Sequence, residues 1–328
     1  MLFLIFFDLS ILYLNDNLVI CDGETYVDGV ACEVIFMSIH LKLVLTTFIW
    51  GLTPTLGKIL SSHGAPIVVT FWRFIFAFLL LCVVLKAQKI SRRLTFSDVV
   101  ALTSLGITGI FLHNALMYKG LQFTGAAITS LIYALIIVKV AVIDSIFSRR
   151  LPSKTVFFGI FFSLIGIVII TFETQSDLTL KEVKLGKGEL LIFGSSLSWA
   201  IYTVLSRPIL TKLLPIEVIT YASFFGLCLM LPFVFADMNS SIMILTDLKS
   251  LTLIIFLGFL STALAFMWHQ QAVKELGPIT TTLYLNLMPI FGVISAVFFL
   301  DETITVYFVL GAMLVMFGIL IVNIKFYR

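Results

Sequence analysis

Apolar residues occur in ten long runs between residues 42 and 324, and a short polar or charged segment bounds each run. Runs of about 17–25 apolar residues have the length that an α-helix needs to cross the hydrocarbon layer of a membrane. Lipid offers no partner to backbone N–H and C=O groups, so an open-ended span must be helical. The sequence therefore predicts helices over residues 42–60, 67–86, 98–118, 125–147, 154–172, 188–206, 216–235, 250–270, 279–300 and 304–324.

The composition agrees with this pattern. Of 328 residues, 60% are hydrophobic and only 12% are charged, whereas a soluble domain is nearer 45–50% apolar and about 25% charged. A soluble enzyme, a nucleic-acid-binding protein and a disordered regulator are thereby excluded. The predicted fold class is an all-α membrane protein whose surroundings are the lipid bilayer.

The first 36 residues differ from the rest, because they hold six acidic residues and no Lys or Arg. They lack the basic segment and the small-residue cleavage site of a signal peptide. Met37 opens a short basic stub, ending at Lys42, that leads directly into the first apolar run. We interpret residues 1–36 as an extension with a misassigned start and Met37 as the first residue translated. An additional N-terminal helix is the alternative.

The distribution of Lys and Arg between loops predicts the orientation. Loops and termini on one side hold 13 of these residues, and those on the other side hold six. The richer side, which includes Lys325 and Arg328 at the C-terminus, is expected to face the cytosol. The predicted location is the inner (plasma) membrane, with multiple spans.

The chain also repeats itself. Trp50-Gly51, Lys58 and Pro66 recur as Trp199-Ala200, Arg207 and Pro215, always 149 positions later, and further matches follow at an offset of 152. Residues 42–172 and 188–324 thus form two five-helix halves, joined by a polar loop over 173–187. Because five is odd, the second half is predicted to be inverted relative to the first. Inverted repeats are typical of transporters with a substrate site between the halves.

These residues resemble a known family. Trp50-Gly51, Lys58 and Arg73, together with Ala263–Glu302 and its Asn286 and Pro289, are similar to the EamA-type half of the drug/metabolite transporter superfamily. The resemblance implies two EamA-like repeats of five helices and a central cavity lined by the third, fourth, eighth and ninth helices. It also implies movement of small metabolites, often outward. The halves differ, since Pro289 and Glu302 correspond to Ile137 and Arg150.

Polar residues within the spans are the candidate site, because a charge at the bilayer centre is costly, by about 2.5–3.5 kcal/mol on insertion scales. Ser130, Tyr133 and Asp144 share one face of the fourth helix, where Asp144 either ends a cavity wall or pairs with Arg149 or Arg150. Lys139 lies off that face and is expected to snorkel to the interface. The predicted substrate contacts are Asn114, Ser130, Tyr133, Trp268, His269, Thr282 and Asn286.

Histidine changes charge near neutral pH, so His113 and His269 could couple transport to protons, as could Asp144. The alternative is a neutral histidine that hydrogen-bonds another helix. Pro289 is expected to loosen its helix beside Asn286, because it cannot donate to the carbonyl of Leu285. Trp50, Lys58, Arg73, Pro289 and Glu302 are predicted to be structural.

The preferred interpretation is a secondary transporter that exports amino-acid-like compounds or amphipathic drugs without ATP. A mostly neutral, partly aromatic cavity wall suits such solutes better than phosphorylated ones, which normally require clustered Arg or Lys. No phosphate-binding loop, catalytic motif, cofactor site or metal site appears in the sequence. A membrane-embedded enzyme, a non-transporting receptor or scaffold, and a carrier of phosphorylated sugars remain alternatives. The expected partners are a small molecule and possible coupling protons but no nucleic acid, and the sequence leaves monomer or homodimer open.

Overall fold

The computed structural model describes residues 11–14, 17–20, 26–27, 30–31, 38–60, 66–90, 92–124, 126–173, 186–292, 294 and 306–323. Near the N-terminus, the short strands β1 (Ile11–Leu14) and β2 (Asn17–Ile20) pair in antiparallel fashion, as do β3 (Tyr26–Val27) and β4 (Val30–Ala31). The alternative of an additional N-terminal helix is therefore wrong for these described residues. The pair Asn15-Asp16, which is typical of turns, stands between the first two strands in the sequence.

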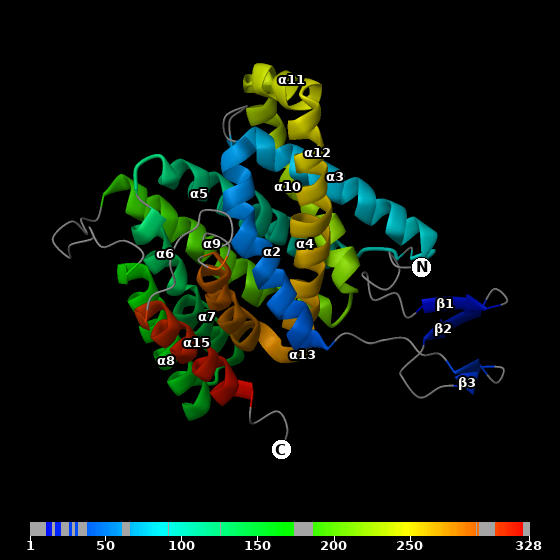
Figure 1. Cartoon of the computed structure of the whole chain (residues 1–328). Helices are drawn as coiled ribbons and strands as arrows, with labels where there is room; N and C mark the ends of the chain where they lie inside the picture. Colours follow the sequence, from blue (N-terminus) through cyan, green and yellow to red (C-terminus); the bar gives the residue numbers. More distant parts are fainter. Residues whose placement is uncertain are drawn as a thin grey trace.

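From residue 38 onward the described chain is helical (Figure 1). The first half comprises α2 (Ile39–Leu60), α3 (Pro66–Ala87), α4 (Phe96–Leu105), the π-helix η1 (Gly106–Leu112), α5 (His113–Leu121), α6 (Ala126–Ala134), α7 (Ile136–Ser148) and α8 (Lys154–Glu173). The second comprises α9 (Lys187–Leu210), α10 (Pro215–Ala236), α11 (Met238–Thr246), α12 (Leu248–Leu257), the π-helix η3 (Gly258–Leu264), α13 (Ala265–Tyr284), the 3₁₀ helix η4 (Leu285–Leu287) and α15 (Val306–Asn323).

Several of these helical segments are long and apolar enough to cross a membrane. Among the described residues there are seven, by length and composition, and two shorter apolar helices cover Ile39–Leu52 and Lys154–Ile170. The longest segment, Leu248–Gly292, contains parts of two predicted runs and is interrupted at Gly277 (φ 82°, ψ 166°). Many apolar side chains on the outside of the bundle, among them Leu79, Val83 and Phe157, are exposed. Such a surface is suited to lipid.

The two halves share element boundaries. The segment α4–η1–α5 and the segment α12–η3–α13 begin and change helix type at positions that differ by 152 throughout. Each begins with a side-chain cap, from Thr95 in the first half and Asp247 in the second. A π-helix is a rare element and often marks a functional region, so its recurrence at one place in both halves reflects common architecture.

Glycines set the close contacts between helices, and equivalent glycines make equivalent contacts. A Cβ on Gly106 would lie 2.7 Å from the carbonyl oxygen of Ala222, and a Cβ on Gly258 would lie 2.8 Å from that of Arg73, the counterpart of Ala222. On α8 and α15, which lie side by side (Figure 1), Gly159 approaches Gly318 and Gly166 approaches Gly311. Each half thus contacts the other through the same small residues with the roles exchanged.

Candidate functional site

Aromatic side chains from both halves meet at the centre of the bundle. The rings of Trp50 on α2 and Trp199 on α9, which are 149 positions apart, contact each other edge to face at 5.5 Å. Phe266 on α13 packs against both rings, at 5.3 Å from Trp50 and 5.6 Å from Trp199. His113 and His269 contact the same aromatic group, and we call these five residues the tryptophan cluster. Edge-to-face packing of this kind is the preferred geometry of aromatic pairs.

His269 is fully buried in the tryptophan cluster. Its ring lies 5.6 Å from that of Trp50 and 5.3 Å from that of Trp199. Both ring nitrogens lack a hydrogen-bond partner among the described residues. An unsatisfied buried polar group costs about 1–3 kcal/mol, so a native structure that keeps one calls for an explanation. A polar solute that enters this region would find available hydrogen-bonding groups.

His113, the other histidine of the cluster, does have hydrogen-bond partners. Its ring lies 4.9 Å from that of Trp199, and its Nδ1 lies 3.2 Å from the backbone oxygen of Ser195 and 3.1 Å from the Ser195 hydroxyl. The same hydroxyl is 2.7 Å from the Tyr133 hydroxyl. Ser195 of α9 therefore links two predicted site residues, and sequence reasoning missed it. The polar pair Ser195-Ser196 within an apolar helix is the signal that could have found it.

The halves are not chemically equal around the two tryptophans. Trp50 Nε1 donates to the backbone oxygen of Ser261 in η3 over 2.8 Å. The indole nitrogen of Trp199 is buried and has no partner among the described residues. A π-helix shifts the hydrogen-bond pattern of its backbone, which leaves a carbonyl free to accept from outside the helix. One tryptophan is thus anchored, and the other retains a free donor.

The other polar residues of the predicted substrate site, which lie outside the tryptophan cluster, form hydrogen bonds within their own helix or to a neighbouring helix. Asn114 donates to the backbone oxygen of Ile110 over 2.7 Å, and Thr282 donates to that of Pro278 over 2.7 Å. Asn286 donates to Ser163 of α8 over 2.7 Å, away from the contacts of the tryptophan cluster. Trp268 is buried, and its indole nitrogen has no partner among the described residues.

The predicted structural residues are placed as follows. The Arg73 guanidinium lies 5.5 Å from the ring centroid of Phe74, and its Nε is buried with no partner in the described part of the chain. The helix tightens to 3₁₀ geometry over Leu285–Leu287, shortly before the half-buried Pro289. The side chains of Ser130 and Lys58, and the whole of Glu302, lie outside the described residues.

Two charged residues of the fourth predicted span bond to α9. Asp144 forms an ion pair with Arg207 of α9, with 3.7 Å between nitrogen and oxygen, so neither Arg149 nor Arg150 is its partner in this pair. The Lys139 ammonium donates to the Ser196 hydroxyl and lies 4.0 Å from the ring centroid of Phe193. These contacts give the ammonium partners on α9, and the reach of Lys139 toward the interface stays a prediction. A polar partner and an aromatic face on the adjacent helix satisfy its charge within the bundle.

Gln270, which follows His269, belongs to a separate buried polar group that sequence reasoning also missed. Its amide nitrogen donates to the hydroxyls of Tyr202 and Ser206, the latter over 3.1 Å. The Tyr202 ring lies 5.2 Å from that of Trp199. This group ties α13 to α9 beside the tryptophan cluster, and it thereby fixes the position of the helix turn that carries His269.

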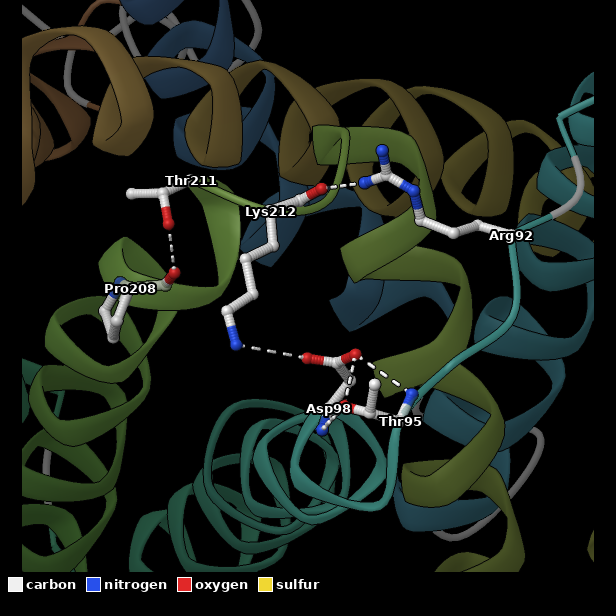
Figure 2. A network of polar contacts seen from close by, with 6 residues as sticks. All are labelled: Arg92, Thr95, Asp98, Pro208, Thr211 and Lys212. Carbon is white, nitrogen blue, oxygen red and sulfur yellow. Dashed lines mark hydrogen bonds and ion pairs between the residues drawn. The ribbon is translucent and has the colours of Figure 1, made fainter.

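A second charged network joins the two halves where α4 begins and α9 ends (Figure 2). Thr95 and Asp98 form a capping box, in which the Asp98 carboxylate accepts from the Thr95 backbone over 3.0 Å. Lys212 lies 3.6 Å from the other Asp98 oxygen, and Arg92 donates to the backbone oxygen of Lys212. The first half thus holds the turn after α9 at two groups of Lys212. Asp98 pairs with its ammonium group, and Arg92 donates to its backbone oxygen.

Comparison with known proteins gives consistent results. The EamA-like transporter family model matches residues 37–172 and again residues 186–324. The uncharacterized transporter YyaM of Bacillus subtilis is 29% identical over 286 residues, which cover 87% of this chain and 93% of that protein. A probable amino-acid metabolite efflux pump of Salmonella typhimurium is 23% identical over 85% of this chain and 92% of its own length.

Two further comparisons complete the picture. An S-adenosylmethionine/S-adenosylhomocysteine transporter of Chlamydia trachomatis is 27% identical over 57% of this chain and 58% of its own length. A protein of known crystal structure shares the fold with a TM-score of 0.69 at 14% identity, covering 88% of this chain and 99% of its own. Because the family model matches both halves, the chain belongs to the EamA-like transporter family.

Proposed function

We propose that this protein is a secondary transporter that exports amino-acid-like metabolites and amphipathic compounds, with a solute path that passes the tryptophan cluster. The observation that carries the proposal is the contact between Trp50 and Trp199, equivalent residues of the two halves. Beside them lies the fully buried His269, whose ring nitrogens have no hydrogen-bond partner within the described part of the chain. A site at the junction of two repeats can be exposed to either side when the halves rock. The proposal includes no catalytic reaction.

The exchanged glycine contacts support an inverted relation between the halves. When a two-fold axis relates two copies, each contact between them occurs twice. If residue a of the first copy contacts residue b of the second, then residue b of the first copy contacts residue a of the second. Gly159 with Gly318 and Gly166 with Gly311 follow that rule, since Gly311 and Gly318 are the counterparts of Gly159 and Gly166. We therefore retain ten spans, arranged as two inverted five-helix repeats in the inner membrane. The excess of Lys and Arg favours a cytosolic C-terminus.

The groups around the cluster favour the proposed substrate class. Aromatic rings surround His269, and the Arg73 guanidinium reaches this region through Phe74, whose ring lies 5.5 Å from the guanidinium and 5.6 Å from the ring of Phe266. Phosphorylated solutes normally require clustered Arg or Lys. Two relatives are named as a probable amino-acid metabolite efflux pump and an S-adenosylmethionine/S-adenosylhomocysteine transporter. Asn114, Trp268, Thr282 and Asn286 remain proposed substrate contacts for another conformation.

Efflux from proteoliposomes, measured with radiolabelled leucine, tests the proposal. Trp199→Phe removes the unpartnered indole N–H and keeps an aromatic ring, so we expect a raised KM at unchanged protein abundance. Trp72→Phe is the matched control, because Trp72 also has a buried, unpartnered indole nitrogen and lies outside the tryptophan cluster. Saturable transport of a sugar phosphate, with no flux of any amino acid, would overturn the proposal.

A further inference from the structure

Two adjoining cavities open where α7 and α9 end, and the tryptophan cluster does not line them. Their volumes are about 360 Å³ and about 270 Å³, and both are lined by Asp144, Arg207 and Ile279. The larger volume lies within the range of about 300–1,000 Å³ that is usual for small-molecule sites. Asp144 belongs to the first half and Arg207 to the second, so the cavities lie at the junction of the halves. We call this space the α7–α9 vestibule.

Opposite charges stand side by side in the α7–α9 vestibule. Asp144 and Arg207 are 3.7 Å apart, and their side chains are 14% and 55% exposed. Arg150 lines the larger cavity as well. Its position depends on Arg149, which ends α7 in the left-handed conformation with φ 52°. Such a conformation is uncommon for a residue other than glycine, and it turns the chain sharply. The site therefore offers one carboxylate and two guanidinium groups.

The rest of the lining is apolar or neutral. Leu151, Pro152 and Ile279 contribute apolar surface to the larger cavity, and Ser148 contributes a hydroxyl. An apolar wall beside paired opposite charges matches a solute with both charges at one end and a hydrocarbon group at the other. An α-amino acid with an aliphatic side chain has this arrangement. A guanidinium group binds a carboxylate through charge-assisted hydrogen bonds, and a carboxylate does the same for an ammonium group.

The smaller cavity borders the break in the second half. Gly277 and Pro278 line it, and Gly277 has φ 82° with no atom within 4 Å of the position of a Cβ. That backbone conformation is one that glycine adopts readily and other residues rarely do. A solute in the α7–α9 vestibule would therefore touch the point at which the helix carrying His269 is interrupted.

We propose that the α7–α9 vestibule is a binding site for zwitterionic aliphatic amino acids, in which Asp144 binds the ammonium group and Arg207, with Arg150, binds the carboxylate. The site is the entrance to the solute path, so it rests on the proposed function and adds the charge recognition that the tryptophan cluster lacks. The incoming solute replaces the Asp144–Arg207 ion pair with one ion pair to each residue. Both charges therefore keep a partner while the halves are no longer joined by that pair.

The test uses three ligands that share the leucine side chain and differ in charge: leucine, leucine methyl ester, which has no carboxylate, and N-acetyl-leucine, which has no ammonium group. Their binding to the purified full chain is measured by calorimetry. We expect Asp144→Asn to weaken leucine and its methyl ester about tenfold or more and not to weaken N-acetyl-leucine, which no longer competes with Asp144 for Arg207. Arg207→Gln should weaken leucine and N-acetyl-leucine and should not weaken the ester, which no longer competes with Arg207 for Asp144. A general folding defect would not give this crossed pattern.

The matched control is Lys212→Gln, which removes a second ion pair between the halves, to Asp98, at a residue that does not line the vestibule. It should bind all three ligands as the unmodified protein does. Loss of leucine binding in both vestibule variants supports the site, whether or not the protein transports leucine. Absence of leucine flux would contradict only the proposed function. Leucine flux with an unchanged KM in Asp144→Asn and Arg207→Gln, or tighter binding of inorganic phosphate than of leucine, would overturn the site and leave the transporter proposal standing.

Discussion

Replacement of Gly166 by alanine would force α8 and α15 apart. A Cβ at this position would lie 2.4 Å from the carbonyl oxygen of Gly311 and 2.9 Å from the backbone nitrogen of Val315, whereas ordinary contact begins at 3.4 Å. These two atoms belong to the backbone, so rotation of the Val315 side chain, whose Cγ2 would lie 2.8 Å away, cannot by itself make room. The helices must therefore separate by about 1 Å, which forfeits roughly a quarter to a half of the dispersion energy of each contact.

The expected free-energy change follows from two opposing effects. Overpacking of this kind costs about 1–3 kcal/mol, and alanine in place of glycine within a helix contributes about 1 kcal/mol of stability. Gly292→Ala provides the control, because its Cβ would lie 3.9 Å from the nearest atom, the carbonyl oxygen of Gly51. The control retains the helix-propensity gain and avoids the clash. The difference between the two variants is then the packing effect alone.

Thermal unfolding of detergent-solubilised protein gives the measurement. A difference of about 1–3 kcal/mol corresponds to roughly 2–12 °C in Tm, since about 2–4 °C accompanies each kcal/mol in proteins of moderate size. Gly166→Ala should melt below Gly292→Ala by that interval. The double variant with Gly311→Ala should lose less than the sum of the single losses, because one displacement of α15 relieves both clashes. Equal Tm values for Gly166→Ala and Gly292→Ala would refute the reasoning.

Three further predictions have defined outcomes. Gly277→Ala should lower stability by about 1–3 kcal/mol although its Cβ meets no atom, because φ 82° strains any residue other than glycine; an unchanged unfolding curve would contradict this. Asp98→Ala should lower Tm more than Lys212→Ala, because both variants lose the same ion pair, which contributes less than about 1 kcal/mol, and Asp98→Ala also removes the capping-box acceptor of the Thr95 N–H; equal losses in the two variants would show that the capping box adds no stability. If the cluster couples transport to protons, His269→Gln should abolish the response of leucine flux to an imposed pH gradient, whereas His40→Gln, whose ring bonds Tyr284 at 2.7 Å outside the cluster, should retain it; a normal response in His269→Gln would exclude His269 as the coupling group.

The location and type of the main elements follow from local sequence. An apolar run of membrane-spanning length leaves the backbone no alternative to helix in lipid, so most of the described helices coincide with predicted runs. The exceptions are α11, which lies between two runs, and α13, which continues across the break predicted after residue 270. The pair Gly277-Pro278 also indicates the interruption near the end of α13. Proline lacks the backbone N–H that a helix needs as a donor, and glycine permits the unusual backbone angles. The offset between Trp50 and Trp199 likewise identifies equivalent positions in the two halves before any contact is known.

The pairing of side chains across helices could not be read from the same pattern. The sequence allowed Asp144 either to line a cavity or to pair with Arg149 or Arg150. The structure pairs it with Arg207, 63 positions away. Asn286 bonds Ser163, and Ser195 joins His113 to Tyr133, although none of these partners is a sequence neighbour. In a soluble helix, water selects a polar face and so reveals which side is buried. Lipid and the protein interior are both apolar, so hydrophobicity does not orient a membrane helix, and close glycine contacts and scarce polar partners decide which faces meet.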